Sequence, residues 1–193
     1  MNEVETSIYW SKRYNQNQIG WDCGKITSPL KEYIDQLTNK DIKILIPGCG
    51  NAYEGEYLWN QGFKNTYILD FAPEAILNFK KLVPDFPNEN IHELDFFDHS
   101  DKYDLIIEQT FFCAIHPTRR NEYAAHVSNM LNEKGKLVGV LFNRDFEGGP
   151  PFGGCIEEYQ NLFSIYFSEV KMNPCYNSIK PRINSELFIR LVK

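Results

Sequence analysis

The chain has 193 residues, of which 42% are hydrophobic and 24% are charged, as in an ordinary globular domain large enough to bury a sizeable core. A net charge of -6, an isoelectric point near 5.3 and the lack of any Lys/Arg run argue against a nucleic-acid partner. No apolar run approaches the roughly 20 residues of a membrane span, and the first residues carry neither a basic nor an apolar leader. We therefore expect one cytoplasmic, monomeric domain with a small-molecule partner and no membrane partner.

The cysteines are scattered and include no C-x-x-C pair and no histidine at zinc spacing: Cys23, Cys49, Cys113, Cys155 and Cys175. They are interpreted as reduced thiols that pack as small hydrophobic side chains. We expect no nucleophilic cysteine and no metal site.

The N-terminal segment is rich in aromatic residues but has no clear hydrophobic period. Its large rings are Tyr9, Trp10, Tyr14 and Trp21. We expect residues 1–24 to form an arm and residues 25–193 to form the main domain. The arm either packs on the domain through aromatic burial or closes over a ligand as a lid, and both interpretations stay open at this stage.

From about residue 28 onward, helical and strand patterns alternate, which is typical of a parallel sheet with crossover helices. The pattern predicts helices over residues 28–37, 53–61, 73–83 and 118–131. It predicts strands over residues 42–46, 66–69, 91–94, 104–108 and 137–142. Gly135 is expected to cap the last helix. Two further β-rich stretches, near 163–170 and 186–192, are expected to pair antiparallel.

Ligands of open α/β sheets bind outside the carboxyl ends of the strands, where the strand order reverses. Gly48 and Gly50 follow the first predicted strand and let the backbone approach a ligand closely. Asp70 ends the second strand 20 residues after Gly50, the spacing at which an acid accepts hydrogen bonds from ribose hydroxyls. Tyr53 stands where a dinucleotide fingerprint requires a third glycine. The pattern therefore favours S-adenosylmethionine, which has a ribose and no pyrophosphate, over NAD or FAD.

Aromatic and acidic residues follow the next two strands. Asp95 and Phe96 come after the third strand and could bracket an adenine ring. Phe111 and Phe112 come after the fourth. With the rings of the arm, they are interpreted either as core or as walls of a dry pocket whose faces attract a sulfonium cation.

Several strings along the chain resemble the thiopurine methyltransferase superfamily, and within it the halide and thiol methyltransferase branch typified by plant "harmless to ozone layer" proteins. They are Ile46-Pro47-Gly48-Cys49-Gly50, Leu69-Asp70, Leu94-Asp95-Phe96-Phe97, Tyr103-Asp104-Leu105-Ile106, Thr110-Phe111-Phe112-Cys113-Ala114-Ile115 and Glu147-Gly148-Gly149-Pro150-Pro151-Phe152. The Phe-Phe-Cys-Ala and Gly-Gly-Pro-Pro-Phe strings are specific, and the resemblance spans nearly the whole chain.

The resemblance implies a Rossmann-like class I S-adenosylmethionine-dependent methyltransferase with a doubly wound, mostly parallel sheet and an antiparallel C-terminal pair. The cofactor-binding residues that it implies, together with those found from the strand ends, are Trp10, Tyr14, Trp21, Gly48, Gly50, Asp70, Asp95, Phe96 and Gln109. Tyr14 stands where the plant branch usually has tryptophan. Gln109 stands where that branch has tyrosine and thiopurine enzymes have arginine. Both departures weaken the acceptor preference that either branch implies.

No general base is obvious, and a thiolate, thiocyanate or halide acceptor would need none. His116, Glu108 and Asp145 are the nearest ionisable candidates, although each also has a structural interpretation. Arg182 falls opposite an arginine of the plant branch and could attract an anionic acceptor. The loop over residues 145–154 is expected to cover the acceptor side.

Three alternatives remain open at this stage. One is a thiopurine-type S-methyltransferase, and another is a family member that binds the cofactor without turnover. The third is an NAD-dependent oxidoreductase, against which the missing third glycine argues.

Overall fold

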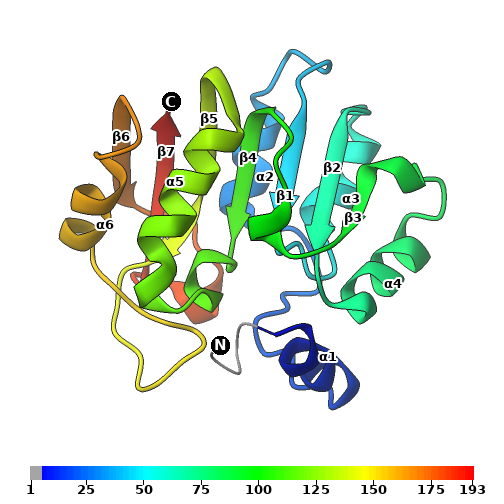
Figure 1. The fold of residues 1–193 in the computed structure, drawn as a ribbon, viewed down its shortest axis with the longest axis horizontal. Coiled ribbons are helices and arrows are strands. Elements are labelled where there is room, and N and C mark those ends of the chain that lie inside the picture. The colour runs from blue at the N-terminus through cyan, green and yellow to red at the C-terminus, as the bar shows by residue number, and fades with distance from the viewer. Residues whose placement is uncertain (1–5) are drawn as a thin grey trace.

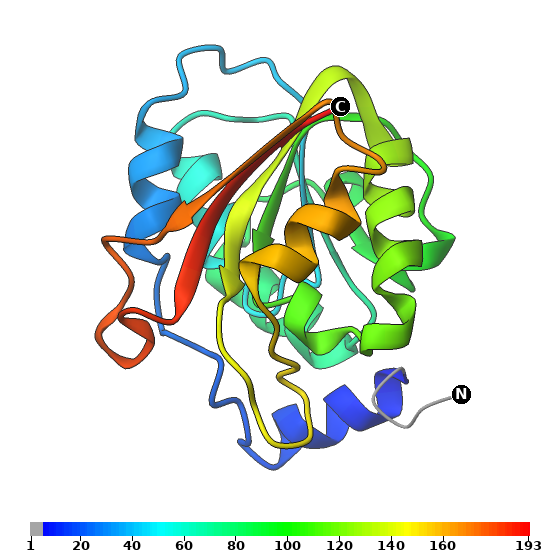
Figure 2. The same cartoon turned by 90° about the vertical axis from the view of Figure 1, so that its left-hand side faces the viewer.

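Seven strands form one mixed sheet in the order β3-β2-β1-β4-β5-β7-β6, with helices on both of its faces (Figures 1 and 2). The computed structural model describes residues 6–193. The strands are β1 (Ile44–Pro47), β2 (Thr66–Asp70), β3 (Ile91–Glu93), β4 (Tyr103–Gln109), β5 (Leu131–Phe142), β6 (Glu169–Pro174) and β7 (Glu186–Val192). The α-helices are α1 (Ser7–Asn15), α2 (Ser28–Asp35), α3 (Tyr53–Asn60), α4 (Pro73–Leu82), α5 (Arg120–Met130) and α6 (Ile156–Phe163).

The first five strands run parallel, while β7 is inserted antiparallel between β5 and β6. The predicted class I fold, with its antiparallel C-terminal pair, is thus confirmed. The strand order reverses at β1, which has β2 on one side and β4 on the other. This reversal creates the crevice in which such sheets bind ligands.

Strand β1 is buried on both faces and shows how the sheet divides the core. Ile44 and Ile46 belong to the hydrophobic cluster under α2, α3 and α4, whereas Leu45 belongs to the cluster under α5 and α6. Successive strand residues point to opposite faces, so a continuous apolar run is what this position requires. Burying each of these side chains contributes about 1.5–3 kcal/mol, which anchors the β1 end that carries the glycine loop.

Two expectations from the sequence were wrong in the last third of the chain. The predicted strand near 163–170 is displaced, because residues 156–163 form helix α6 and the strand begins only at Glu169. Ile165, two residues after the buried Phe163, is 68% exposed, whereas a strand would place both side chains on the same face. Gly135 does not cap α5, which ends at Met130. Instead it lies within β5, near an irregularity in the pairing of β5 with β4, where an added Cβ would lie 2.8 Å from the Asn132 carbonyl oxygen.

The arm contains a helix that the sequence pattern did not reveal. Thr6 caps α1 by accepting a hydrogen bond from the Tyr9 backbone N–H at 3.3 Å, and α1 has no fully buried residue. Asn15 donates to Glu74 at the start of α4, at 2.9 Å. Residues 1–5 of the predicted arm lie outside the described part of the chain. None of the helices in residues 6–193 combines the length and apolar character that a membrane crossing requires.

Candidate active site

A cavity of about 460 Å³ lies at the carboxyl ends of β1, β2 and β4. Figure 1 shows α1 below the ends of these strands, on the side toward which β1 and β2 point. Gly48, Asp70 and Gln109, each at or just after a strand end, all line the cavity. The volume falls within the usual range of small-molecule sites.

The glycine loop after β1 is held against two aromatic side chains. Gly48 and Gly50 have φ values of +54° and +56°, a region that favours glycine. A Cβ added to Gly48 would fall 2.0 Å from the Phe111 ring. A Cβ on Gly50 would lie 3.2 Å from the Tyr14 hydroxyl oxygen. These two glycines therefore allow the loop to pass beneath the arm and against the turn that follows β4.

Asp70, at the end of β2, is buried and joins the loops that follow β1 and β2. Its carboxylate accepts hydrogen bonds from the backbone N–H groups of Gly50 and Ala72, each at 2.9 Å. Burial raises the pKa of Asp70 to about 6, although the backbone hydrogen bonds oppose the shift. The group is thus an ionised hydrogen-bond acceptor at neutral pH, and each carboxylate oxygen keeps capacity for a further donor.

Gln109, at the end of β4, carries a donor without a partner. Its Oε1 accepts a hydrogen bond from the Thr27 hydroxyl at 2.9 Å. Its Nε2 is buried and has no hydrogen-bond partner among the described residues. Thr110, which also lines the cavity, has a φ of 58°, an unusual conformation for a β-branched residue. Both features are typical of a turn shaped to meet a ligand.

Asp95 and Phe96 also line the cavity, but both have structural contacts. The Asp95 carboxylate accepts from the Phe97 backbone N–H at 2.9 Å and so caps the short helix η3 (Phe96–Asp98). Phe96 is only 3% exposed, and its ring packs edge-on against Phe111 at a centroid distance of 5.0 Å. Most of this ring therefore belongs to the core, and only its edge is available to the cavity.

The aromatic residues of the arm form one side of the cavity. Trp21 makes edge-to-face contacts with Trp10 and Tyr14, at ring-centroid distances of 5.3 and 5.8 Å. Asp22 accepts hydrogen bonds from the Asn51 amide and, at 3.3 Å, from the Tyr53 hydroxyl. The arm is thus fastened directly to the segment that follows the glycine loop.

Arg182, from the C-terminal part of the chain, also lines the cavity and is 8% exposed. Its Nη2 donates to the Trp21 carbonyl oxygen at 2.9 Å, and its Nη1 lies 3.5 Å from the Glu186 carboxylate. The Nη1 atom makes no hydrogen bond to any described residue. Three side chains of the C-terminal half share this wall: Phe142, Phe146 and Pro151. The predicted covering loop over residues 145–154 therefore contributes part of it.

Glu54, a buried acid that the sequence analysis missed, also lines the cavity. It lies in the first turn of α3, a position where acids are common because they favour the positive end of the helix dipole. Burial raises the pKa of Glu54 to about 7, and the nearby Arg182 charge opposes the shift. In the sequence, only the position of Glu54 shortly after the glycine loop could have indicated that it lines the cavity.

The other ionisable candidates from the sequence do not line the cavity. His116 Nδ1 lies 2.8 Å from the Thr118 hydroxyl oxygen, and Asp145 is exposed. Glu108 is fully buried, and its carboxylate accepts from the Phe111 and Phe112 backbone N–H groups and from the Tyr123 hydroxyl. Glu108 therefore shapes the turn after β4 from behind.

Three thiols line the cavity, the half-buried Cys23 and the buried Cys49 and Cys113. The last two are the more deeply buried. Burial raises the pKa of Cys113 to about 12 and that of Cys49 well above its ordinary value. Both remain protonated at neutral pH and are therefore poor nucleophiles.

The fold matches that of class I S-adenosylmethionine-dependent methyltransferases. Magnesium protoporphyrin IX methyltransferase from Synechocystis, solved with bound S-adenosylhomocysteine, superposes with a TM-score of 0.72 at 11% identity, covering 97% of this chain and 99% of that chain. The 1,6-didemethyltoxoflavin-N1-methyltransferase of Burkholderia thailandensis, also solved with S-adenosylhomocysteine, gives 0.70 at 14% identity, covering 97% and 86%.

The sequence comparison identifies the family of the chain, which is a narrower class than its fold. The model of the thiopurine S-methyltransferase (TPMT) family matches residues 5–184, and the chain belongs to this family. It is thus an S-adenosylmethionine-dependent methyltransferase that acts on a small-molecule acceptor.

Curated relatives from plants and bacteria are similar to the chain over most of its length. "Probable thiol methyltransferase 2" of Arabidopsis thaliana is 27% identical, covering 92% of this chain and 81% of the relative. "Thiocyanate methyltransferase 1" of Brassica oleracea is 24% identical over the same shares of the two chains. The thiopurine S-methyltransferase of Vibrio campbellii is 28% identical, covering 82% of each chain.

The chemistry of the cavity fits the methyl donor that the family uses. Ribose hydroxyls need an acceptor, which the Asp70 carboxylate supplies. The unpartnered Gln109 Nε2 supplies a donor. The aromatic faces of the arm suit the positive charge of a sulfonium.

Proposed function

We propose that this enzyme transfers a methyl group from S-adenosylmethionine to a small soft nucleophile, namely a thiol, thiocyanate or a halide, by in-line displacement. The observation that carries the proposal is the character of the part of the cavity wall that the C-terminal half of the chain forms. A buried arginine there, Arg182, lies among aromatic and proline side chains, and no described histidine lines the cavity. Such a wall attracts an anion while offering no histidine base.

We assign cofactor binding to the nine residues predicted from the sequence, which all line the cavity: Trp10, Tyr14, Trp21, Gly48, Gly50, Asp70, Asp95, Phe96 and Gln109. Asp70 accepts hydrogen bonds from the ribose, and Gly48 and Gly50 bring backbone groups to the amino-acid end of the donor. Gln109 satisfies its free Nε2 on the same ligand. Residues 1–24 act as a lid, and the Asp22–Asn51 contact holds its described part closed.

S-adenosylmethionine supplies a methyl group on a positively charged sulfur. The protein positions the acceptor against the methyl group and excludes water from the cavity. Arg182 holds the acceptor opposite the methyl group, and the arm excludes water, which strengthens the attraction between Arg182 and an anion. Correct orientation and desolvation alone are worth several kcal/mol of the roughly 7–11 kcal/mol available from such effects. Thiocyanate and iodide then react with no proton to remove.

The direct test supplies methyl-labelled S-adenosylmethionine with thiocyanate, iodide, a small thiol and a thiopurine in separate reactions. Each product is identified by mass spectrometry. We expect methyl thiocyanate, methyl iodide and the methyl thioether of the small thiol. Methylation of the thiopurine alone would contradict the proposed acceptor class.

A second candidate, thiopurine-type S-methylation, is favoured by one observation. With a pKa near 7, Glu54 could take a proton from an acceptor that enters as a neutral thiol. The Glu54→Gln variant separates the two candidates. Thiocyanate turnover should be unchanged in either case, because thiocyanate has no proton to remove. Thiopurine turnover should fall at least tenfold only if Glu54 is the base.

A further inference from the structure

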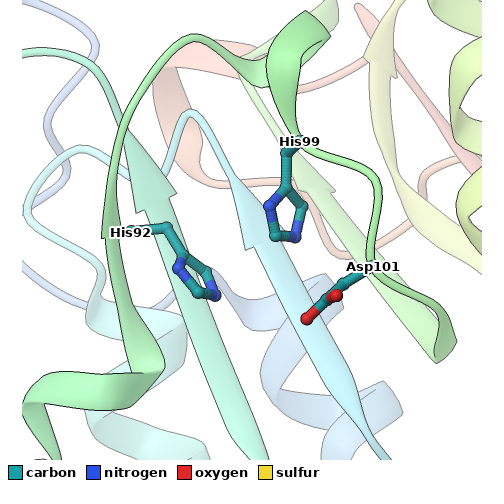
Figure 3. A group of neighbouring side chains, drawn as sticks. All are labelled: His92, His99 and Asp101. Carbon is teal, nitrogen blue, oxygen red and sulfur yellow. The ribbon is translucent and has the colours of Figure 1, made fainter.

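Three potential metal ligands meet beside the sheet, outside the cavity at the carboxyl ends of the strands. One ligand atom each from His92, His99 and Asp101 lies within 4.8 Å of the others. Figure 3 shows the two imidazole rings and the carboxylate pointing toward a common space beside β2 and β1. His92 belongs to the edge strand β3, and the other two residues lie on the segment between η3 and β4.

Both imidazole rings are held in place by neighbouring aromatic side chains. His92 stacks on Tyr67 with a centroid distance of 5.7 Å and an interplanar angle of 6°. Its Nε2 is buried and has no hydrogen-bond partner among the described residues. His99 is buried, and its Nε2 lies 2.6 Å from the Tyr103 hydroxyl oxygen. The His92 nitrogen is therefore a buried polar atom that lacks the partner such atoms normally have.

The charge of Lys43 is the main obstacle to a metal ion at this place. Its Nζ lies 3.2 Å from the Asp101 carboxylate and 4.7 Å from the ring centroids of Tyr67 and Tyr103. The cluster thus already attracts one cation. The lysine side chain is 27% exposed and that of Asp101 is 56% exposed, so both can move. A divalent ion would displace the ammonium from Asp101.

We propose that His92, His99 and Asp101 form a binding site for a divalent transition-metal ion such as Zn²⁺. Two imidazoles and one carboxylate are ligands that zinc prefers, with a fourth position left for water. Zinc takes nitrogen and oxygen ligands at about 2.0–2.2 Å, so its ligand atoms lie within roughly 4.4 Å of one another. A small movement of the exposed Asp101 side chain closes the remaining gap.

The contact between His99 Nε2 and the Tyr103 hydroxyl bears on which nitrogen of His99 would bind the ion. Binding through His99 Nδ1 would keep the Tyr103 contact as the one that orients the ring, whereas binding through Nε2 would replace it.

The site is separate from the cavity but lies on the same loop. Asp95 and Phe96 line the cavity, and His99 follows three residues later. A metal would tie this loop to the edge strand β3 and so restrain it. The role that follows is structural, and methyl transfer itself does not need the ion.

Isothermal titration of the full-length, chelator-treated protein with Zn²⁺ tests the site, with His116→Ala as a control that removes a histidine elsewhere. We expect one site in the wild type and in the control. His92→Ala should weaken binding more than about 100-fold, beyond the roughly 10- to 100-fold that loss of an orienting residue costs. Lys43→Gln should tighten it, because the competing cation is gone.

Circular dichroism and S-adenosylhomocysteine binding establish that each variant is folded, and Asp101→Asn provides a second ligand variant at an exposed position. The spectrum of the Co²⁺ complex should lack the intense thiolate band that cysteine ligands would give. Equal zinc affinity in wild type and His92→Ala, or a thiolate band with Co²⁺, would overturn the proposal.

Discussion

The cavity has two halves that are built in different ways. In the half that we propose binds the cofactor (the cofactor half), Gly48, Asp70 and Gln109 each lie at or just after the end of a parallel strand, and their positions are set by hydrogen-bonded backbone. In the half that we propose binds the acceptor (the acceptor half), Arg182 lies in the short 3-10 helix η6 (Lys180–Arg182) before β7, and Phe146 lies in the irregular segment after β5. The first half is suited to hold one fixed ligand, whereas the second can change with little cost to the fold. Substitutions in the two halves should therefore have different kinetic signatures.

Gly48→Ala should have the largest effect, because it combines an unfavourable φ of +54° with a Cβ 2.0 Å from the Phe111 ring. Strain and overpacking together should cost about 2–4 kcal/mol of folding free energy. We expect loss of S-adenosylhomocysteine binding by calorimetry and a lower midpoint in urea unfolding. Gly20→Ala, where nothing lies within 4 Å of the added Cβ, is the matched control and should remain close to wild type.

Asp70→Asn should weaken S-adenosylhomocysteine binding by about 1.5–3 kcal/mol, or roughly 10- to 100-fold. The loss of activity that follows should be the same for every methyl acceptor. The pKa of Asp70 is raised to about 6, so the acceptor form is lost as pH falls below that value. Wild-type affinity should accordingly decrease between pH 7 and pH 5, and the variant should not show this decrease. A folded variant with wild-type affinity would remove Asp70 from the cofactor half.

Arg182→Met should raise the KM for thiocyanate about tenfold, because a hydrogen bond to a charged group is worth about 1.5–3 kcal/mol. Cofactor affinity should fall less, because the cofactor loses only the indirect support of the hydrogen bond from Arg182 to Trp21. Steady-state kinetics with thiocyanate and a neutral thiol provide the measurement. Arg144→Met is the control, since Arg144 lines the same cavity but is exposed and its charge is screened by water. Equal effects of the two variants would argue against a specific anion site.

Asp22→Ala should have the smallest effect, because it removes the contacts of the arm with Asn51 and Tyr53 and one local hydrogen bond from the Gly24 backbone N–H. We expect a loss of about 1 kcal/mol in arm closure, seen as a roughly fivefold lower kcat/KM with an unchanged unfolding midpoint. Tryptophan fluorescence should respond less to S-adenosylhomocysteine than in wild type. A variant that is less stable but fully active would mean that the arm is only packing.

The sequence allowed the cofactor half to be predicted because its residues follow apolar runs, whose period reveals where strands end. Asp70 and Gly50 needed only that register and their spacing to be placed together. Glu54 was missed because an acid in the first turn of a helix is ordinarily solvated, and only the fold buries it. Arg182 could be suggested by resemblance, but its contact with Trp21 depends on a loop and an arm that have no period.

Other misses have equally physical causes. Helix α1 has no buried residue and places Trp10 and Tyr14 at the cavity rather than on a buried stripe, so no helical period marks it. Phe163 and Phe167 are apolar in a short β-rich stretch that looked like a strand. The cluster of His92, His99 and Asp101 has a spacing unlike that of zinc fingers, and only the crossing of the loop over β2 and β1 brings the three together.

The central claim is that the acceptor brings its own nucleophilic electron pair and that the protein provides no base. The dependence of kcat/KM on pH between pH 7 and 9 tests it most directly, measured with thiocyanate, with a small thiol, and again in the Glu54→Gln variant. The rate with thiocyanate should be flat, and the rate with the thiol should rise toward the thiol's own pKa, in both wild type and variant. A rise with pH that appears for both acceptors and disappears in Glu54→Gln would contradict the claim.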